Sequence, residues 1–153
     1  MKRTSTLISS IFIFILTASF IFGGEDTSSV ESKQFKISIM EAKKGGKAGL
    51  AEEDVCVFKS GKFRTGYFKQ NAGAEAIPIE LTKDSTYFDE AVDADMIYVE
   101  FEGEITNKLE ETVKIVGTID GYSIEGNVKL SKKDKVKKNW SFSGSLKEKK
   151  KKK

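Results

Sequence analysis

Carboxylate side chains are the residues of this sequence whose type and spacing come nearest to a reactive site. Nine of them fall within one stretch of the chain, against a single lysine, Lys108. They are Asp89, Glu90, Asp93, Asp95, Glu100, Glu102, Glu104, Glu110 and Glu111. Such a cluster can bind calcium or supply an acid and base pair, but calcium needs six or more converging oxygens, and the spacing of Asp93 and Asp95 is not that of an EF-hand. Because Glu100, Glu102 and Glu104 alternate with apolar residues, we expect a solvated outer strand face.

Histidine and cysteine, which many enzymes use for proton transfer or metal binding, are nearly missing. The chain of 153 residues contains no histidine and one cysteine. This composition excludes Ser-His-Asp and Cys-His catalytic pairs, histidine-ligated zinc and an intramolecular disulfide. Cys56 has alternating apolar neighbours, so we expect a small buried apolar residue rather than a reactive thiol. The sequence therefore predicts a protein that is not an enzyme and that uses no metal and no cofactor.

Aromatic side chains at strand spacing form a second candidate site, for binding rather than catalysis. A small closed barrel either fills its interior with such side chains or holds one small ligand near its mouth, and the sequence leaves both open. The candidate ligand-binding residues are Phe58, Phe63, Tyr67, Phe101, Tyr122 and Trp140. We expect Tyr122 and Trp140 at the rim, because each has a polar tip that requires water or a partner.

Lysines gather toward the end of the chain, with six between residues 129 and 138. We expect residues 131–138 to form a solvated hairpin tip. The chain ends in five consecutive lysines, Lys149, Lys150, Lys151, Lys152 and Lys153. A run of this kind cannot pack, so we expect a disordered tail that either contacts an anionic envelope surface or only keeps the chain soluble. The tail has no ordered aromatic platform for bases, so nucleic acid is not an expected partner.

Short alternating segments must position these side chains. Period-two patterns separated by turn residues predict strands over residues 35–40, 55–59, 62–69, 76–83, 96–105, 113–119, 122–130 and 139–146. Ser60-Gly61 is expected to join two of them so that Phe58 faces Phe63, and further turns are expected at 71–74 and 83–85. Pro78 favours a sheet edge or a bulge, because proline cannot donate to a ladder. No stretch after the N-terminal segment shows convincing helical periodicity.

The segment from Thr112 to Leu130 is the most informative hairpin. Asp120-Gly121 between alternating runs indicates a tight turn. If these two residues form the loop, Gly117 faces Ile124; if the loop spans 120–123, Gly117 faces Gly126 instead. Both registers keep the same inner face, and glycines on adjacent strands are typical of a tightly curved sheet.

The N-terminal segment has the pattern of an export signal. Lys2 and Arg3 precede an uncharged run of 16 residues, Leu7 to Phe22, shorter than the ~20 needed to cross a bilayer. We expect a signal peptide over residues 1–24, a β-domain over 25–148 and a lysine tail over 149–153. The protein is then secreted or periplasmic; the alternative is a membrane anchor formed by an uncleaved N-terminal helix. One domain of this size buries enough surface to fold without disulfides.

Three segments carry a resemblance to a known type of domain. They read DVCVFKSGKFRTG from Asp54, VGTIDGYSIEGNV from Val116 and NWSFSGSLKE from Asn139. Together they resemble small exported bacterial domains that look like lipocalin-type barrels and mostly lack an assigned function. The strand pattern predicts an all-β, antiparallel up-and-down meander of about eight strands that is closed into a small barrel or forms a strongly curved sandwich. The resemblance implies the lipocalin-like barrel.

Three functions follow as expectations. The first is an exported, non-enzymatic barrel, a monomer, that binds a small apolar or amphipathic molecule. The second is an interaction module that docks on an envelope polymer or another protein through its outer surface and its lysine tail. The third is a carboxylate-based hydrolase, which requires two acids between residues 89 and 104 to converge in a cleft.

Overall fold

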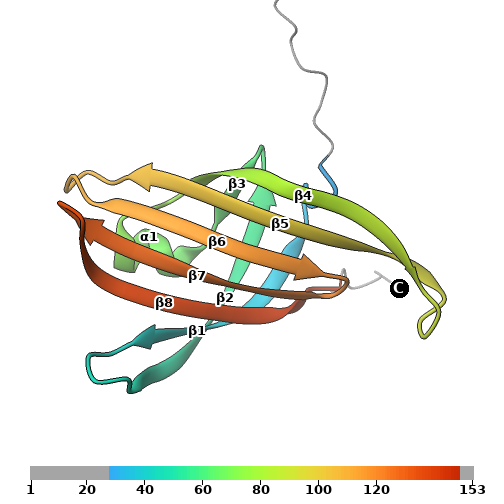
Figure 1. Ribbon diagram of the computed structural model, residues 1–153, viewed down its shortest axis with the longest axis horizontal. Coiled ribbons are helices and arrows are strands. Elements are labelled where there is room, and N and C mark those ends of the chain that lie inside the picture. Colours follow the sequence, from blue (N-terminus) through green and yellow to red (C-terminus); the bar gives the residue numbers. More distant parts are fainter. Residues whose placement is uncertain (1–27, 149–153) are drawn as a thin grey trace, which may run out of the picture.

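The protein is an all-β chain with one short helix (Figure 1). The computed structural model describes residues 28–148, so the expected signal peptide and lysine tail lie outside the described residues. The strands are β1 (Gln34–Ala42), β2 (Ala48–Lys59), β3 (Lys62–Arg64), β4 (Ile77–Asp89), β5 (Ala94–Thr106), β6 (Thr112–Asp120), β7 (Ser123–Lys132) and β8 (Lys135–Leu146). The helix, α1, spans Gly66–Ala72. Within residues 28–148, no helix is both long enough and apolar enough to span a membrane.

The eight strands form an antiparallel meander that closes into a barrel-like ring, as the sequence predicted. Each strand pairs with the next along the chain, and β1 returns to pair with β8 from Phe35 opposite Leu146 to Glu41 opposite Trp140. Closure removes most of the exposed sheet edge. The ring also brings the two ends of the described chain together, because the Lys147 amide donates to the Gln34 carbonyl at 2.7 Å.

The hairpin of β6 and β7 adopts the second of the two expected registers. Gly117 faces Gly126, and the loop itself consists of Gly121 and Tyr122 only. Gly121 has a φ of 58°, which a first loop position of a type II′ turn requires. A Cβ on Gly126 would lie 2.5 Å from the ring of Phe142, and one on Gly117 would overlap the ring of Phe101. The paired glycines therefore give two phenylalanine rings their space inside the sheet.

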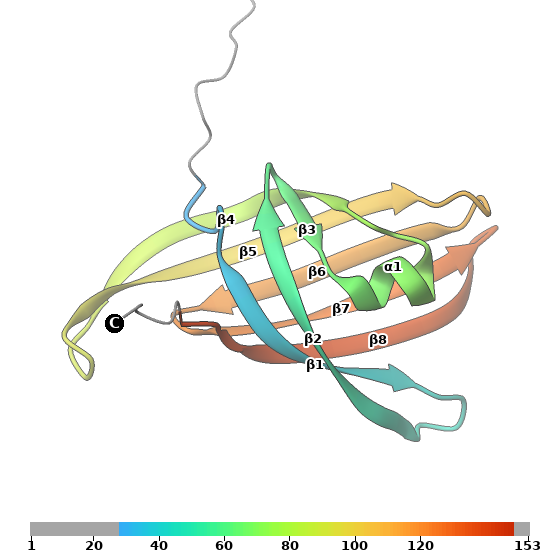
Figure 2. The same ribbon diagram turned by 180° about the vertical axis from the view of Figure 1, so that it is seen from behind.

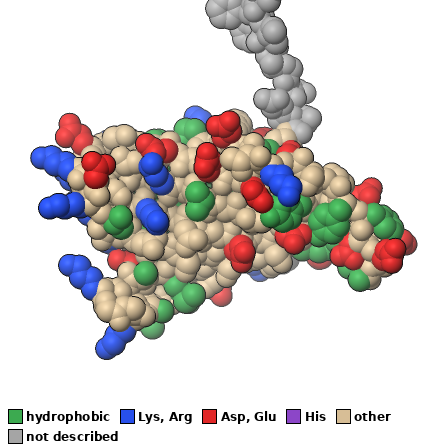
Figure 3. Space-filling view, viewed as in Figure 1, with side chains coloured by type: hydrophobic (Ala, Val, Ile, Leu, Met, Phe, Trp, Pro, Cys, Tyr) green, Lys and Arg blue, Asp and Glu red, His purple; other side chains and the backbone are tan. Residues whose placement is uncertain are grey.

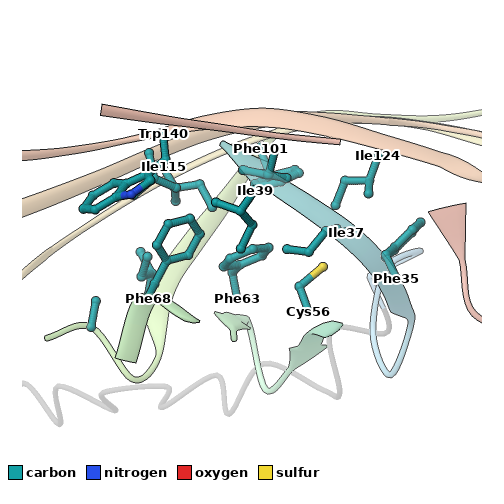
Figure 4. Packing of buried hydrophobic residues seen from close by; sticks show 14 of the residues in the cluster. Phe35, Ile37, Ile39, Cys56, Phe63, Phe68, Phe101, Ile115, Ile124 and Trp140 are labelled. Atoms are coloured by element: carbon teal, nitrogen blue, oxygen red, sulfur yellow. The ribbon is translucent and has the colours of Figure 1, made fainter. Parts of the chain in front are cut away.

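Alternating residues from all the strands fill the interior of the ring. Figure 4 shows side chains from β1, β2, β5, β6 and β8 pointing toward one another, with Phe68 of α1 beside Trp140. The largest fully buried side chains are Trp140, Phe35, Phe58, Phe63, Phe68, Phe101, Ile37, Ile39, Ile77, Ile115, Ile119 and Ile124. Cys56 is fully buried among them, as predicted, and burial raises the pKa of its thiol to about 12.

The region after the first hairpin differs from the sequence prediction. Phe58 does face Phe63 across Ser60-Gly61, but β3 stops at Arg64 and the predicted strand over 62–69 ends in α1. The Thr65 hydroxyl accepts the Tyr67 amide at 3.1 Å as the N-cap, and Gly73 closes the helix with a φ of 64°. Period two places Phe63, Thr65 and Tyr67 on one strand face and Phe68 on the other, whereas the helix buries Phe68 and leaves Tyr67 half-buried.

The second difference concerns β4. A turn was predicted at residues 83–85, but the strand continues to Asp89, with a register shift between Leu81 and Lys83. The polar residues that suggested a turn lie in a strand exposed on both faces. Pro78 faces Lys62, the first residue of β3, so the predicted edge or bulge corresponds to the position beside which the outer edge of β4 becomes unpaired.

Candidate functional site

Three of the six predicted site residues form the centre of the aromatic core. Phe58 lies 5.2 Å from Phe101 and 5.5 Å from Phe63, measured between ring centroids, with both pairs edge to face. All three side chains are buried. Aromatic pairs in this geometry stabilise a core beyond the area that they bury. These residues therefore pack against one another.

Trp140 is buried rather than at the rim, because α1 covers it. Its ring lies 5.6 Å from that of Phe68 and 6.4 Å from that of Tyr67, and both partners belong to the helix that the sequence pattern missed. Tyr67 is half-buried. Burial raises the pKa of its phenol, the carboxylates of Glu52 and Glu41 act in the same direction, and the Trp140 indole opposes them. Helix α1 thus closes one end of the ring.

Tyr122 occupies the other end of the ring. It lies in the turn between β6 and β7 with 54 % of its surface exposed. Its carbonyl accepts the Leu146 amide at 2.7 Å, which ties the turn to the end of β8. The six residues expected to share one site therefore divide into a central cluster, a covered end and an exposed turn.

A hollow of about 1150 Å³ lies between the segment before β1, the turn from β2 to β3, and β4. We call it the seam hollow. Of the six predicted residues, Phe58 lines it. The complete lining is Ser28, Val30, Glu31, Phe58, Ser60, Gly61, Lys62, Ile79, Glu80, Leu81 and Asp84. Its volume slightly exceeds that of typical small-molecule pockets, and its lining combines four apolar side chains with six polar or charged ones.

The turn at Ser60-Gly61 produces this hollow. It starts β3 at Lys62, opposite Pro78, and β3 then runs away from Ile79 and Leu81, so it pairs with β4 only at Lys62 and Phe63. The last backbone bond across this seam runs from the Ile79 amide to the Gly61 carbonyl at 3.0 Å. Beyond Ile79, no described residue forms a ladder with the outer edge of β4. The seam hollow is the gap between this edge of β4 and the two segments that face it, the turn from β2 to β3 and the segment before β1.

The segment that precedes β1 forms a fixed wall of the seam hollow. The Ser32 amide donates to the Phe58 carbonyl at 2.8 Å, and the Phe58 amide donates to Lys33 at 3.1 Å. The Ser60 amide donates to the Glu31 carboxylate at 2.9 Å. Across the gap, the Ser29 hydroxyl donates to Asp84 at 2.6 Å. These hydrogen bonds fix the positions of the segments that surround the seam hollow.

Charges around the seam hollow are mainly negative. Glu31, Glu80 and Asp84 line it, against one lysine, Lys62. An apolar wall beside an excess of carboxylates favours a ligand with an apolar body and a cationic head.

A second hollow, of about 420 Å³, lies on the outer surface of the ring above the paired glycines. Serine, threonine and asparagine side chains dominate its lining, with Glu125 as the one charged residue. Its lining is Ser38, Met40, Val116, Gly117, Thr118, Glu125, Gly126, Asn127, Ser141, Phe142 and Ser143. It offers hydrogen bonds but little apolar surface, so it suits an amphipathic ligand less well than the seam hollow.

The acidic stretch does not form one site. Glu102 and Glu104 are exposed on β5, as expected, and Glu104 pairs with Lys114 at 2.9 Å. Within residues 28–148, no group of three or more acidic or thiol side chains is arranged to hold a metal ion. No acidic residue between 89 and 104, the range in which a carboxylate hydrolase would need a converging pair, lines the seam hollow or the smaller hollow on the outer surface.

Glu111 is the acidic residue whose role the sequence pattern missed. Only 6 % of its surface is exposed. Its carboxylate accepts hydrogen bonds from Asn107 at 3.0 Å and from Lys137 at 2.6 Å, which lower its pKa in that order. Asn107 also donates to the carbonyl of Ala72 at the end of α1. Glu111 therefore joins the loop after β5 to β8 and to the helix, which is a structural role.

The C-terminal lysines belong to opposite ends of the molecule. Strand β8 runs the length of the ring, so Lys135 lies at one end and Lys147 at the other, beside Gln34. The turn between β7 and β8 consists of Lys133 and Asp134 only, shorter than the tip predicted over 131–138. Sequence proximity suggested one basic region, whereas the strand between its parts separates them.

Comparison with known proteins gives no further assignment. No protein-family model, curated protein or solved structure matches the chain.

Proposed function

We propose that the protein is an exported, lipocalin-like barrel that binds a small amphipathic molecule in the seam hollow and catalyses no reaction. The eight-stranded closed meander supports the lipocalin-like assignment. The observation that carries the binding function is the seam hollow itself, with Val30, Phe58, Ile79 and Leu81 on its apolar wall. The buried aromatic cluster beneath Phe58 acts as the rigid floor of this site.

The ligand has an apolar body and a cationic head in this proposal. The apolar wall removes hydrocarbon from water, at about 0.8 kcal/mol for each buried methylene group. Glu31, Glu80 and Asp84 then attract the head. An anionic amphiphile of the same length would meet repulsion from the same three groups.

The test is calorimetric titration of the exported protein with dodecyltrimethylammonium and with dodecyl sulfate, below the concentration at which each forms micelles. We expect the cationic amphiphile to bind at least about tenfold more tightly, which corresponds to about 1.4 kcal/mol. Leu81→Asn should weaken binding about tenfold, because it replaces the apolar wall with an amide. Leu50→Asn is the matched control, since Leu50 is 89 % exposed and does not line the seam hollow.

Two results would overturn the proposal. One is the absence of binding by both amphiphiles in native mass spectrometry as well as calorimetry. The other is an equal loss in Leu81→Asn and Leu50→Asn, which would place binding elsewhere. Asp84→Asn tests the head group separately, because it should reduce the preference for the cation and leave the affinity for the anionic amphiphile unchanged or higher.

A second function, docking on an anionic envelope surface, is favoured by the lysines that gather at one end of the molecule in Figure 3. In this proposal the lysine tail, residues 149–153, provides a second attraction, separate from these lysines because it follows Lys147 at the other end. Sedimentation with vesicles of anionic phospholipid tests it, at low and at high salt. Deletion of 149–153 should reduce the bound fraction at low salt, whereas a bound fraction unchanged by deletion and by salt would contradict it.

A further inference from the structure

Strands β4 and β5 extend past the ring as a two-stranded arm, which we define as residues 82–97 (Figure 2). The outer edge of β4 has no ladder partner after Ile79 among the described residues. The outer edge of β5 pairs with β6 only from Tyr98 onward, apart from one bond between the Gly121 amide and the Ile97 carbonyl. Unpaired strand edges are surfaces on which another chain can add.

The arm is held in place on one face and exposed on the other. The Tyr87 hydroxyl donates to Asp120 at 2.6 Å, and the buried Met96 side chain lies against Gly121. Phe88 and Val92 have no such cover and are 56 % and 49 % exposed. An isolated two-stranded ribbon is only marginally stable in water. The contacts of Tyr87 and Met96 therefore hold the arm in place, with Phe88 and Val92 exposed.

Charge on the arm is strongly one-sided. Lys83 is its only basic residue. Its acidic residues are Asp84, Asp89, Glu90, Asp93 and Asp95. Figure 3 shows acidic and hydrophobic side chains mixed on this tip of the molecule. Two arms cannot pair with each other favourably, because like charges would meet across the contact.

The opposite end of the same molecule has the complementary character. We call it the basic end; it consists of the loop between β1 and β2, the loop between β5 and β6, and the tip of β7 and β8. Its lysines outnumber its acidic residues, Glu110, Glu111 and Asp134; they are Lys43, Lys44, Lys47, Lys108, Lys132, Lys133, Lys135 and Lys137. Leu109 and Val136 lie among them with 66 % and 60 % of their surfaces exposed. Strand β8 has an unpaired edge there too, because β1 pairs with it only up to Trp140.

We propose that the arm of one copy docks on the basic end of a second copy, head to tail. Three properties match across this contact: opposite charge, exposed apolar side chains on both surfaces, and unpaired strand edges on both. Since the two surfaces differ and lie at opposite ends, the contact is heterologous and repeats from copy to copy. Short chains of copies, rather than the monomer expected from the sequence, then form at low ionic strength.

The experiment is sedimentation velocity of the exported protein at about 10 mM and about 1 M salt, between which the Debye length falls from ~30 Å to ~3 Å. We expect concentration-dependent assembly at low salt and at least a tenfold weaker association at high salt, a factor of ~10 that screening of several charge pairs readily produces. Phe88→Ser should weaken assembly at low salt, because the contact also buries this ring.

Charge reversal distinguishes the head-to-tail contact from other modes. Glu90→Lys with Asp95→Lys removes the net negative charge of the arm, and Lys133→Glu with Lys135→Glu removes most of the net positive charge of the basic end. Each double variant alone should remain monomeric, and an equimolar mixture of the two should form a one-to-one pair, because the unmodified arm of one variant meets the unmodified basic end of the other. The matched control for the arm variant is Glu53→Lys with Glu125→Lys. It raises the net charge by the same amount at exposed positions of β2 and β7, and it should assemble as the unmodified protein does.

Failure of the mixture to assemble would overturn the proposal, and so would a monomeric unmodified protein at low salt. Stronger assembly of the arm variant alone would indicate contact between two arms and would also overturn it. Circular dichroism of each variant establishes that it is folded. The amphiphile titration above is independent of this result, because the arm variants leave the lining of the seam hollow unchanged.

Discussion

The sheet closes in different ways on the two sides of the ring. From β5 to β8 and on to β1, long ladders follow one another, and glycines replace side chains where the sheet must bend. Around β3, a strand of three residues lies between the turn at Ser60-Gly61 and a helix, and beyond that turn the ladder with β4 is replaced by side-chain hydrogen bonds and the seam hollow. The comparison teaches that continuous pairing fills the interior, whereas interrupted pairing leaves a hollow.

The largest expected effect is on the continuous side. Gly144→Ala would place a Cβ in overlap with the backbone carbonyl of Lys36 on β1. A strand backbone cannot rotate away as a side chain can, so we expect a loss of about 3 kcal/mol in the free energy of unfolding, measured in urea. Gly66→Ala is the control on the interrupted side: its new Cβ would meet only Asp54, at 3.6 Å, at the start of α1. There we expect a gain of up to about 1 kcal/mol. Equal effects of the two variants would contradict the comparison.

An intermediate effect is expected from Asp54, which fixes the interrupted side. Burial alone would raise the pKa of its carboxyl, but hydrogen bonds from the Thr65 hydroxyl and from the amides of Tyr67, Val55 and Gly66 outweigh burial and hold the pKa below 3.8. Asp54→Asn should reduce the free energy of unfolding by about 1–2 kcal/mol at neutral pH.

The pH dependence of this contribution has a definite sign. Because the pKa is lowered in the folded state, the stabilisation by Asp54 is fully present above its ordinary value of 3.8. It is lost as the pH falls through the lower folded value. The Asp54→Asn difference should therefore shrink when urea unfolding is measured at about pH 3 instead of about pH 6. Glu53→Gln, on the exposed neighbour, is the control; a difference that does not change with pH would show that the bonds, not the charge, matter.

The smallest effect concerns how readily each side opens. Burial raises the pKa of Cys56 to about 12, so the native thiol should resist a disulfide reagent until the structure opens. Cys56 also makes stability decline as the pH rises above its ordinary value of 9.0, because the buried thiol cannot ionise freely. Asp54→Asn should accelerate labelling of Cys56 a few-fold, since it weakens the adjacent side.

The matched probe on the continuous side is Ile124→Cys in a Cys56→Ala background, because Ile124 is equally buried and lies in a continuous ladder. We expect it to be labelled more slowly at the same pH. Equal rates, both as slow as global unfolding, would show that the ring opens only as a whole.

Much of the fold could be predicted from the sequence, because alternation and turn residues act locally. The β6 and β7 hairpin, the pairing of Phe58 with Phe63 and the burial of Cys56 follow from period two and from Gly121 and Gly61. The register of Gly117 could not be decided, since both loops keep the same residues inside. The structure decides it by the fit of Phe101 and Phe142 into the space above the glycines.

The candidate site was less predictable, because it depends on where a strand stops. Nothing in the apolar pattern distinguishes a strand over 62–69 from a strand of three residues followed by α1. The sequence does contain two signals for this helix, Thr65 as an N-cap and Gly73 as a C-cap. They span nine positions and enclose one helix of two turns. Ile79 and Leu81 become pocket residues because the chain turns at Ser60-Gly61 and leaves the outer edge of β4 without a partner beyond Ile79, which alternation along β4 does not show.

The hydrogen bond from Lys147 to Gln34 brings the first and last strands to one point. Chain order is therefore a weak constraint on this architecture. A circular permutant that links these ends and opens between Lys133 and Asp134 would keep all eight ladders, including β1 with β8. Such a rearranged gene would place its new termini in the basic end, where a reporter could be fused at the end of the molecule opposite the arm.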